Sequence, residues 1–173
     1  MPPIPELRVA AARYVLGDLP SWEMPQFADR LAELDICSTA ISDLATMREP
    51  IMSDAGPLFE QILRESAIDL PSVDESLEIV LRLYVSQIAS RVIGPRPGLR
   101  SIANIYYSAN LYDRSRHDVG DSHGLEHLLA SFYLYDDTEE CSLEDKNGPE
   151  AHRALDEDVV RQANDWLEAH GRE

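Results

Sequence analysis

The sequence predicts an all-α fold, an irregular helical bundle of about seven or eight helices in a single domain. Apolar residues recur three and four positions apart along most of the chain, which is the spacing of one face of a helix. No segment has the alternation of apolar and polar residues that is typical of a strand. With 173 residues, 44% of them hydrophobic, the chain can bury one core, so we expect one domain over residues 1–173.

Four helices are expected in the first 70 residues. They are predicted at residues 4–16, 21–34, 38–47 and 53–68. Gly17 is a natural stop for the first helix, because glycine readily takes the left-handed conformation found after a helix. Ser21 is expected to cap the second helix, and the signal Ser53-Asp54 followed by Pro57 is expected to start the fourth.

A capping box is expected to open the next helix. Ser72 and Glu75 have the spacing at which a serine oxygen and a glutamate carboxylate satisfy free N–H groups at a helix start. The apolar stripe of this helix consists of Leu77, Val80, Leu81, Tyr84, Ile88 and Val92. The segment Gly94-Pro95-Arg96-Pro97-Gly98 is expected to end it, because proline and glycine oppose helix formation. A shorter helix should follow, with apolar residues Leu99, Ile102, Ala103, Ile105 and Tyr106.

Two more helices are predicted in the last third of the chain. Residues 110–120 form a polar loop in this prediction, and Asp121 or Ser122 then caps a helix. An acidic connection is expected at residues 136–149, followed by an amphipathic helix that ends near residue 169.

One short motif has the form of a zinc site. His123-Gly124-Leu125-Glu126-His127 fits H-x-x-E-H, in which two histidines on one side of a helix hold Zn²⁺ and the glutamate takes a proton from the metal-bound water. The segment HGLEHLLASF resembles the zinc-binding helix of the S-ribosylhomocysteine lyases, and this resemblance implies that His123 and His127 are ligands. That family differs in placing the motif early in an α/β chain and a cysteine ligand far downstream.

Helical geometry favours a different role for the motif. At 100° per residue, Leu125, Leu128, Leu129 and Phe132 share one face, and His123 and His127 lie close to the opposite face. If the leucines meet the core, both imidazoles face solvent, without the dry cavity that hydrolysis requires. We therefore expect no metal and no cofactor, and the zinc-dependent hydrolase or lyase is the alternative hypothesis.

The charge of the chain is strongly negative. It has 32 acidic and 15 basic residues, a formal net charge of −17. Such a surface repels phosphates and anionic lipids, so we expect neither a nucleic acid nor a membrane as partner, whereas a basic protein would be attracted.

No segment is apolar enough for a membrane span and no signal peptide is recognised, which predicts a cytoplasmic protein. Cys37 and Cys141 are expected to be reduced thiols.

Carboxylates are concentrated after the histidine motif. The predicted interaction surface consists of Asp136, Asp137, Glu139, Glu140, Glu144 and Asp145. Its expected role is docking of a basic protein, because charge complementarity raises association rates and selects partners.

A longer segment carries a second resemblance. Four segments resemble parts of small all-helical proteins of unassigned function from bacteria, particularly actinobacteria, over about residues 27–137. They are FADRLAELDICSTAISDLATM, GPLFEQILRESAIDLPS, LYVSQIASRVIGPRPGLRSIANIYYSAN and HLLASFYLYDD. This resemblance implies a helical bacterial domain and no catalytic residues. Size, charge and expected compartment together predict a non-enzymatic, protein-binding domain, in its most specific form an immunity-type protein that neutralises a basic toxin.

Overall fold

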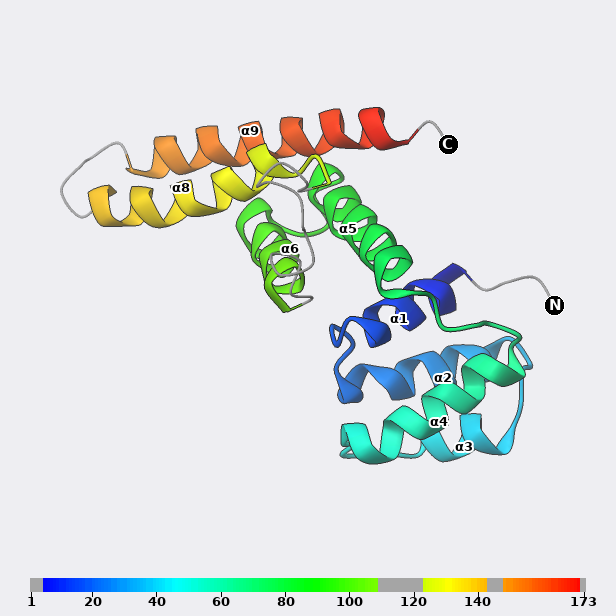
Figure 1. The fold of residues 1–173 in the computed structure, drawn as a ribbon. Coiled ribbons are helices and arrows are strands. Elements are labelled where there is room, and N and C mark those ends of the chain that lie inside the picture. Colours follow the sequence, from blue (N-terminus) through cyan, green and yellow to red (C-terminus); the bar gives the residue numbers. More distant parts are fainter. Residues whose placement is uncertain (1–4, 109–122, 143–147, 172–173) are drawn as a thin grey trace. The chain divides into compact units, whose positions relative to one another are not determined.

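The computed structural model describes residues 5–108, 123–142 and 148–171, and it confirms the all-α prediction. Every regular element among these residues is a helix (Figure 1). The 3₁₀ helix η1 spans Ser21–Glu23. The α-helices are α1 (Pro5–Val15), α2 (Met24–Glu33), α3 (Thr39–Ala45), α4 (Met52–Glu65), α5 (Val73–Ala89), α6 (Pro95–Ser108), α8 (Glu126–Ser142) and α9 (Gly148–His170).

The chain divides into two compact units, Met1–Val80 and Leu81–Glu173, and the division falls within α5. We call them the first and the second unit. Each unit has buried apolar residues of its own. The expectation of one domain over residues 1–173 stays a prediction.

The core of the first unit is centred on Phe59 of α4. This side chain is fully buried, and its ring lies 5.5 Å from that of Tyr14 and 6.2 Å from that of Phe27, centroid to centroid. Helix α3 packs against both α2 and α4. The other large core residues are Leu7, Leu19, Met24, Leu31, Ile41, Leu44, Ile62 and Leu63. One aromatic residue thus links α1, α2 and α4 into one apolar cluster.

Polar side chains join α1 to its neighbours in the first unit. Arg13 forms ion pairs with Asp18 (2.9 Å) and Glu23 (2.6 Å). The hydroxyl of Tyr14 donates a hydrogen bond to Glu60 (2.8 Å). Burial raises the pKa of Tyr14 to about 12, and the hydrogen bond and negative charge of Glu60 add to the rise.

The capping box at the start of α5 is confirmed. The Ser72 hydroxyl oxygen accepts from the Glu75 N–H (3.2 Å), and the Glu75 carboxylate accepts from the Ser72 N–H (2.9 Å) and hydroxyl (2.7 Å). The hydrogen bonds from Ser72 lower the pKa of Glu75. The expected cap at Ser21 is wrong: its hydroxyl donates instead to the carbonyl of Pro50 (2.7 Å), which ties η1 to the start of α4.

Two proline predictions are corrected. Helix α4 starts at Met52, before the expected signal, so that Pro57 lies inside the helix. The segment from Gly94 to Gly98 does not separate two helices, because Pro95 is the first residue of α6. Proline is tolerated in a first turn, where its missing N–H would have no helical partner, and the first bond of α6 runs from the Gly98 N–H to the Gly94 carbonyl (3.0 Å).

Helix α5 also ends earlier than expected. Its last helical residue is Ala89, and Arg91 follows in the left-handed conformation with φ 58°. Val92, expected on the buried stripe, is therefore outside the helix and exposed, whereas Val85 is buried.

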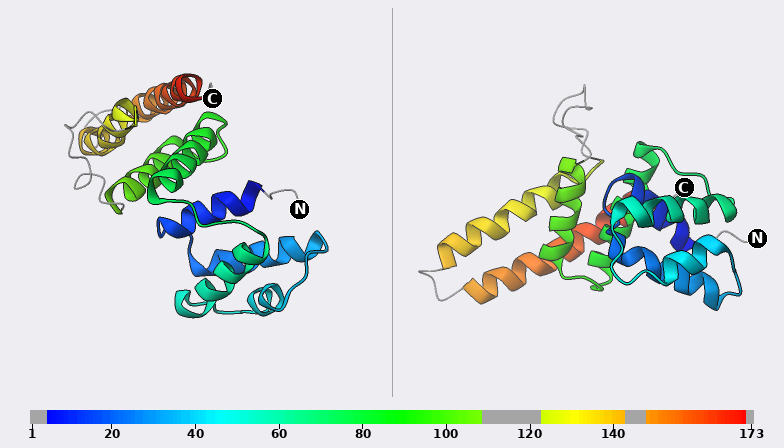
Figure 2. Two further views of the ribbon diagram at one scale, coloured as in Figure 1. Left: turned by 45° about the vertical axis from the view of Figure 1, so that its right-hand side comes forward. Right: turned by 90° about the horizontal axis from the view of Figure 1, so that it is seen from below.

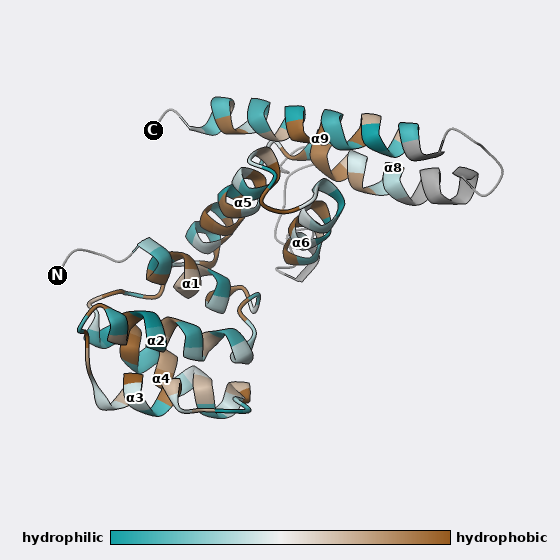
Figure 3. Ribbon diagram, turned by 180° about the vertical axis from the view of Figure 1, so that it is seen from behind, coloured by the Kyte–Doolittle hydropathy of each residue, from teal (hydrophilic) through white to brown (hydrophobic). Residues whose placement is uncertain are grey.

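The second unit contains α6, α8 and α9, with α8 and α9 side by side and antiparallel (Figure 1 and Figure 2). Hydrophilic residues predominate on the side of α9 that faces away from α8 (Figure 3), and Val159, Ala163 and Trp166 are buried. Between the helices, the Tyr135 hydroxyl donates to Asp156, and burial followed by this bond raises the pKa of Tyr135.

No helix in the described parts of the chain combines the length and the apolar character needed to cross a membrane.

Candidate functional site

The histidine motif is not wholly helical, which corrects the sequence prediction. Helix α8 begins at Glu126, and His123 and Gly124 form a turn in the left-handed conformation, with φ 54° and 71°. The two histidines are therefore not one helical turn apart on a common face. Leu125 and Leu128 are buried and both histidines are exposed, as the sequence predicted.

The turn is held by α9. The indole N–H of Trp166 donates to the carbonyl of His123 (2.8 Å). The ring of His170 stacks on Trp166 at a centroid distance of 4.3 Å, and its Nδ1 donates to the Trp166 carbonyl (2.9 Å). Gly124 faces these rings, because a Cβ at this residue would lie 3.0 Å from His170 Cε1. The motif thus has a structural role, in which its glycine fits against two aromatic rings.

A cavity of about 390 Å³ lies beside this turn. Its lining residues are Gly124, His127, Leu128, Arg161, Gln162, Asp165, Trp166, Ala169 and His170. Arg161 is paired with Asp158 and with Asp165 (3.1 Å). Across the residues with described positions, no three His, Cys, Asp or Glu side chains are grouped closely enough to hold a metal ion. The geometry on which the zinc hypothesis depended, two histidines on one helical face, is not present.

Gly124→Ala is expected to lower the free energy of unfolding by about 1–2 kcal/mol. An alanine there would carry the cost of the left-handed conformation and would press its Cβ against His170. His127→Ala, on an exposed side chain of the same motif, should change stability by less than about 0.5 kcal/mol. Urea denaturation followed by circular dichroism measures both. A larger loss for His127→Ala than for Gly124→Ala would contradict this structural role.

The predicted acidic surface lies largely outside what the structure describes. The backbone of residues 136–140 belongs to α8, which continues to Ser142, so the expected connection from residue 136 is wrong at its start. The side chains of Asp136, Asp137, Glu139 and Glu140 are outside the described residues, as are Glu144 and Asp145 entirely. The docking role of this surface stays a prediction.

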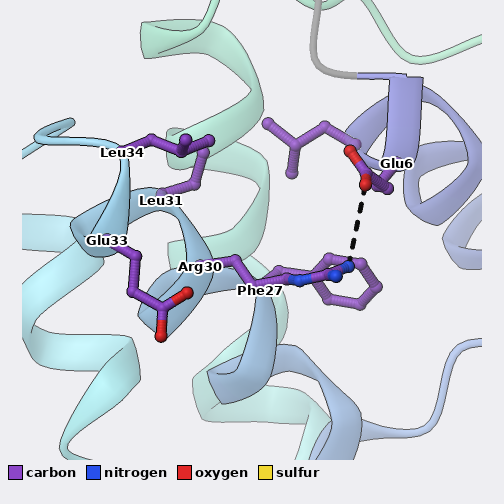
Figure 4. Close-up of a pocket in the computed structure, with 7 residues that line it drawn as sticks. Glu6, Phe27, Arg30, Leu31, Glu33 and Leu34 are labelled. Atoms are coloured by element: carbon purple, nitrogen blue, oxygen red, sulfur yellow. Dashed lines mark ion pairs between the residues drawn. The ribbon is translucent and has the colours of Figure 1, made fainter.

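A groove between α1 and α2 is a candidate site in the first unit (Figure 4). We call it the α1–α2 groove; it has a volume of about 250 Å³. Its lining residues are Glu6, Leu7, Phe27, Arg30, Leu31, Glu33 and Leu34. Two of these, Leu7 and Leu31, are buried core residues that form the floor, and Leu34 adds an apolar side chain that is 59% exposed.

The rim of the groove is charged. Arg30 extends from α2 toward Glu6 on α1, with 3.8 Å between the guanidinium nitrogen and the carboxylate oxygen (Figure 4). Both side chains are more than half exposed, and exposed pairs of this kind contribute about 0–1 kcal/mol. Glu33 is a further exposed rim carboxylate, in the last turn of α2, where the helix dipole is also negative. The rim can therefore exchange one cation for another at small cost.

The first unit, which contains this groove, is strongly acidic. Residues 1–80 contain fifteen Asp and Glu against five Arg, and no Lys. Arg13 is neutralised by its two carboxylate partners, and Arg30 by Glu6. The exposed carboxylates, among them Asp29 and Asp35 close to the groove in sequence, are thus in excess.

Sequence reasoning missed this site because it looked for runs of acidic residues. The carboxylates of the first unit are dispersed along the sequence, and Glu6 and Glu33 line one groove only when α1 packs beside α2. One signal was present: counting charge separately for residues 1–80 gives a net charge of −10 without any run.

No family model, curated protein or solved structure matches the chain. The resemblance to small helical actinobacterial proteins stays a prediction. The chemistry of the α1–α2 groove and of its surroundings is accordingly the basis for a function.

Proposed function

We propose that this chain is a non-enzymatic binding domain for a basic protein, and that the α1–α2 groove receives a lysine or arginine side chain of that partner. The observation that supports this most directly is an apolar floor beneath a carboxylate rim, in a unit with three acidic residues for every basic one. The aliphatic stem of a lysine or arginine would cover Leu31 and Leu34, while its charged end stays at the rim.

The size of the groove favours a side chain over a small-molecule substrate. Sites for cofactors and drug-sized ligands usually have volumes of roughly 300–1,000 Å³. At about 250 Å³ the groove is smaller than that range. Its polar lining consists of two carboxylates and one guanidinium group, and no histidine, serine or cysteine is among its lining residues.

The pair between Glu6 and Arg30 gives a physical route for binding. An incoming guanidinium or ammonium group can take the place of Arg30 beside Glu6, because the exposed pair is weak. Arg30 is itself on the rim and can then turn toward Glu33 or toward solvent. The exchange leaves no buried charge unpaired.

The specific form that we propose is an immunity-type protein that covers the positive surface of a basic toxin. Its support is the small size and the net charge of −17, which would speed encounter with a cationic protein and select against anionic ones. The predicted surface at residues 136–145 would add to the same attraction.

Neutralising the rim is expected to weaken binding about tenfold at low salt, which corresponds to about 1.4 kcal/mol. The variant is Glu6→Gln with Glu33→Gln. The partner is a cationic protein captured from extract of the native cells by the tagged chain, then purified for isothermal titration calorimetry. Wild-type affinity should fall as salt rises, because the attraction is screened.

The matched control is Asp43→Asn with Asp69→Asn, which removes the same charge from exposed positions of the same unit outside the groove. It should weaken binding less than about twofold. Neutralising Asp136, Asp137, Glu139 and Glu140 together shows whether the second acidic surface contributes. If no cationic partner is captured at low salt, the proposal is wrong. If the rim and control variants lose equal affinity, the groove is not the binding site.

A further inference from the structure

Three of the exposed large apolar side chains of the first unit lie in two joined segments away from the α1–α2 groove. They are Trp22 in η1, which is 63% exposed, and Ile51 and Met52 at the start of α4, which are 59% and 44% exposed. The two segments are 29 residues apart in sequence, yet the hydrogen bond from Ser21 to Pro50 (2.7 Å) joins them, and η1 packs against α4. We call these three residues the Trp22 patch.

The composition of the Trp22 patch is typical of a binding site. An exposed tryptophan leaves a large apolar area in contact with water, and tryptophan is among the residues that most often dominate interface energies. Methionine is flexible and adapts to the shape of a partner. The core of the first unit is complete without these three side chains, because Phe59 and its neighbours are already enclosed.

The charges around the Trp22 patch indicate what can cover it. Arg13 has Asp18 and Glu23 as partners, so this nearby cluster has a net negative charge. Glu49 and Asp54 flank the patch in sequence and are exposed, and Arg48 is the only exposed cation in the same segments, residues 18–24 and 46–54. A partner that lays an apolar side chain on Trp22 therefore meets carboxylates at its edges.

These charges select one occupant. A second copy of this chain would bring another net charge of −17 against the first, and an anionic lipid surface or a nucleic acid would be repelled for the same reason. A cationic protein segment can bind through both features of the patch. Its apolar residue covers Trp22, and its lysines or arginines approach Glu49 and Asp54.

We infer that the Trp22 patch is a second docking point for the basic partner, and that it receives an apolar side chain flanked by lysine or arginine. The inference rests on the proposed function and names a feature of the partner, namely an exposed apolar residue within its positive surface. The α1–α2 groove recognises charge on a flexible stem, whereas the Trp22 patch recognises apolar area.

Two probe peptides of equal length and charge test this inference. One is an amphipathic lysine- and arginine-rich helix with a leucine face, and in the other serine replaces each leucine. Binding to the full chain is measured at low salt by fluorescence anisotropy of the labelled peptides. The leucine peptide should bind at least about fivefold more tightly. This advantage should disappear in Trp22→Ser and persist in Val92→Ser, a change at an exposed apolar residue of the second unit.

Tryptophan fluorescence gives an independent readout. Trp22 and Trp166 are the two tryptophans of the chain, and Trp166 is buried. In the wild-type chain, the leucine peptide should shift the emission to shorter wavelength and reduce quenching by acrylamide, because it covers Trp22. The serine peptide should do neither.

Each outcome has a definite meaning. If both peptides bind with equal affinity, or if the leucine advantage survives Trp22→Ser, the Trp22 patch is not a docking point while the proposed function stands. If neither peptide binds at low salt, the proposed function fails and the inference with it. Loss of the leucine advantage in Trp22→Ser alone supports the inference.

Discussion

Phe59→Ala is expected to lower the free energy of unfolding of the first unit by about 3–5 kcal/mol. The side chain is fully buried, and its ring contacts those of Tyr14 and Phe27 at tilted angles of 56° and 58°. Alanine would leave a cavity between α1, α2 and α4 that the surrounding helices cannot fill, and the contacts between the tilted rings would be lost as well.

Urea denaturation of the full chain, followed by circular dichroism, measures this loss. Leu70→Ala is the control, because it also truncates a large apolar side chain, but at a position that is about half exposed. The control should change the free energy of unfolding by less than about 1 kcal/mol. A loss below about 1 kcal/mol for Phe59→Ala would show that this residue is not at the centre of the core.

Gly98→Ala is expected to destabilise the second unit by about 1–3 kcal/mol. A Cβ at residue 98 would lie 2.4 Å from Ile88 Cγ1, 2.7 Å from Ile88 Cδ1 and 2.9 Å from Ile93 Cδ1. Ile88 is fully buried and β-branched, so it cannot move aside without disturbing its own neighbours. Alanine is a better helix former than glycine by up to about 1 kcal/mol, and this gain offsets part of the loss.

A double-mutant cycle with Ile88→Val separates overpacking from other causes. Valine keeps Cγ1 but lacks Cδ1, which would lie 2.7 Å from the new Cβ, so part of the clash is relieved and the double variant should be more stable than the sum of the two single changes predicts. Thermal unfolding of the four proteins gives the coupling. Additive losses would mean that Gly98 does not set the approach of α6 to Ile88.

The ends of the helices show how far local sequence reasoning reaches. The capping box of Ser72 and Glu75 could be predicted, because its donors and acceptors lie within four residues of one another. Three helices, α2, α4 and α5, end without glycine: Asp35, Ala67 and Arg91 follow them with positive φ values of 59°, 54° and 58°. In each case the next N–H bonds to the carbonyl five residues back, at 2.9–3.0 Å. No residue type marks these stops, so the stripe of α5 was extended too far, to Val92.

Proline was misread for a related reason. Its missing N–H forbids nothing in a first turn, so the segment Gly94 to Gly98 could either separate two helices or start one. The prediction treated proline and glycine only as residues that oppose a helix, and it therefore favoured the separation. Burial of Leu99, Ile102 and Ala103 on one face of α6, with Gly98 against Ile88, is what selects the helical start.

By itself, the sequence determined that the chain is helical, which residues form most of the cores, and that the surface is acidic, because these follow from spacing and composition. The tertiary structure decided where function can lie. In it, His123 and Gly124 lie in a turn outside the helix, and the glycine packs against Trp166 and His170. It also brought Glu6 beside Arg30 and Trp22 close to the start of α4. Contacts between residues far apart in sequence depend on packing and on hydrogen bonds between distant segments of the chain. The spacing of residues within one segment does not indicate such contacts.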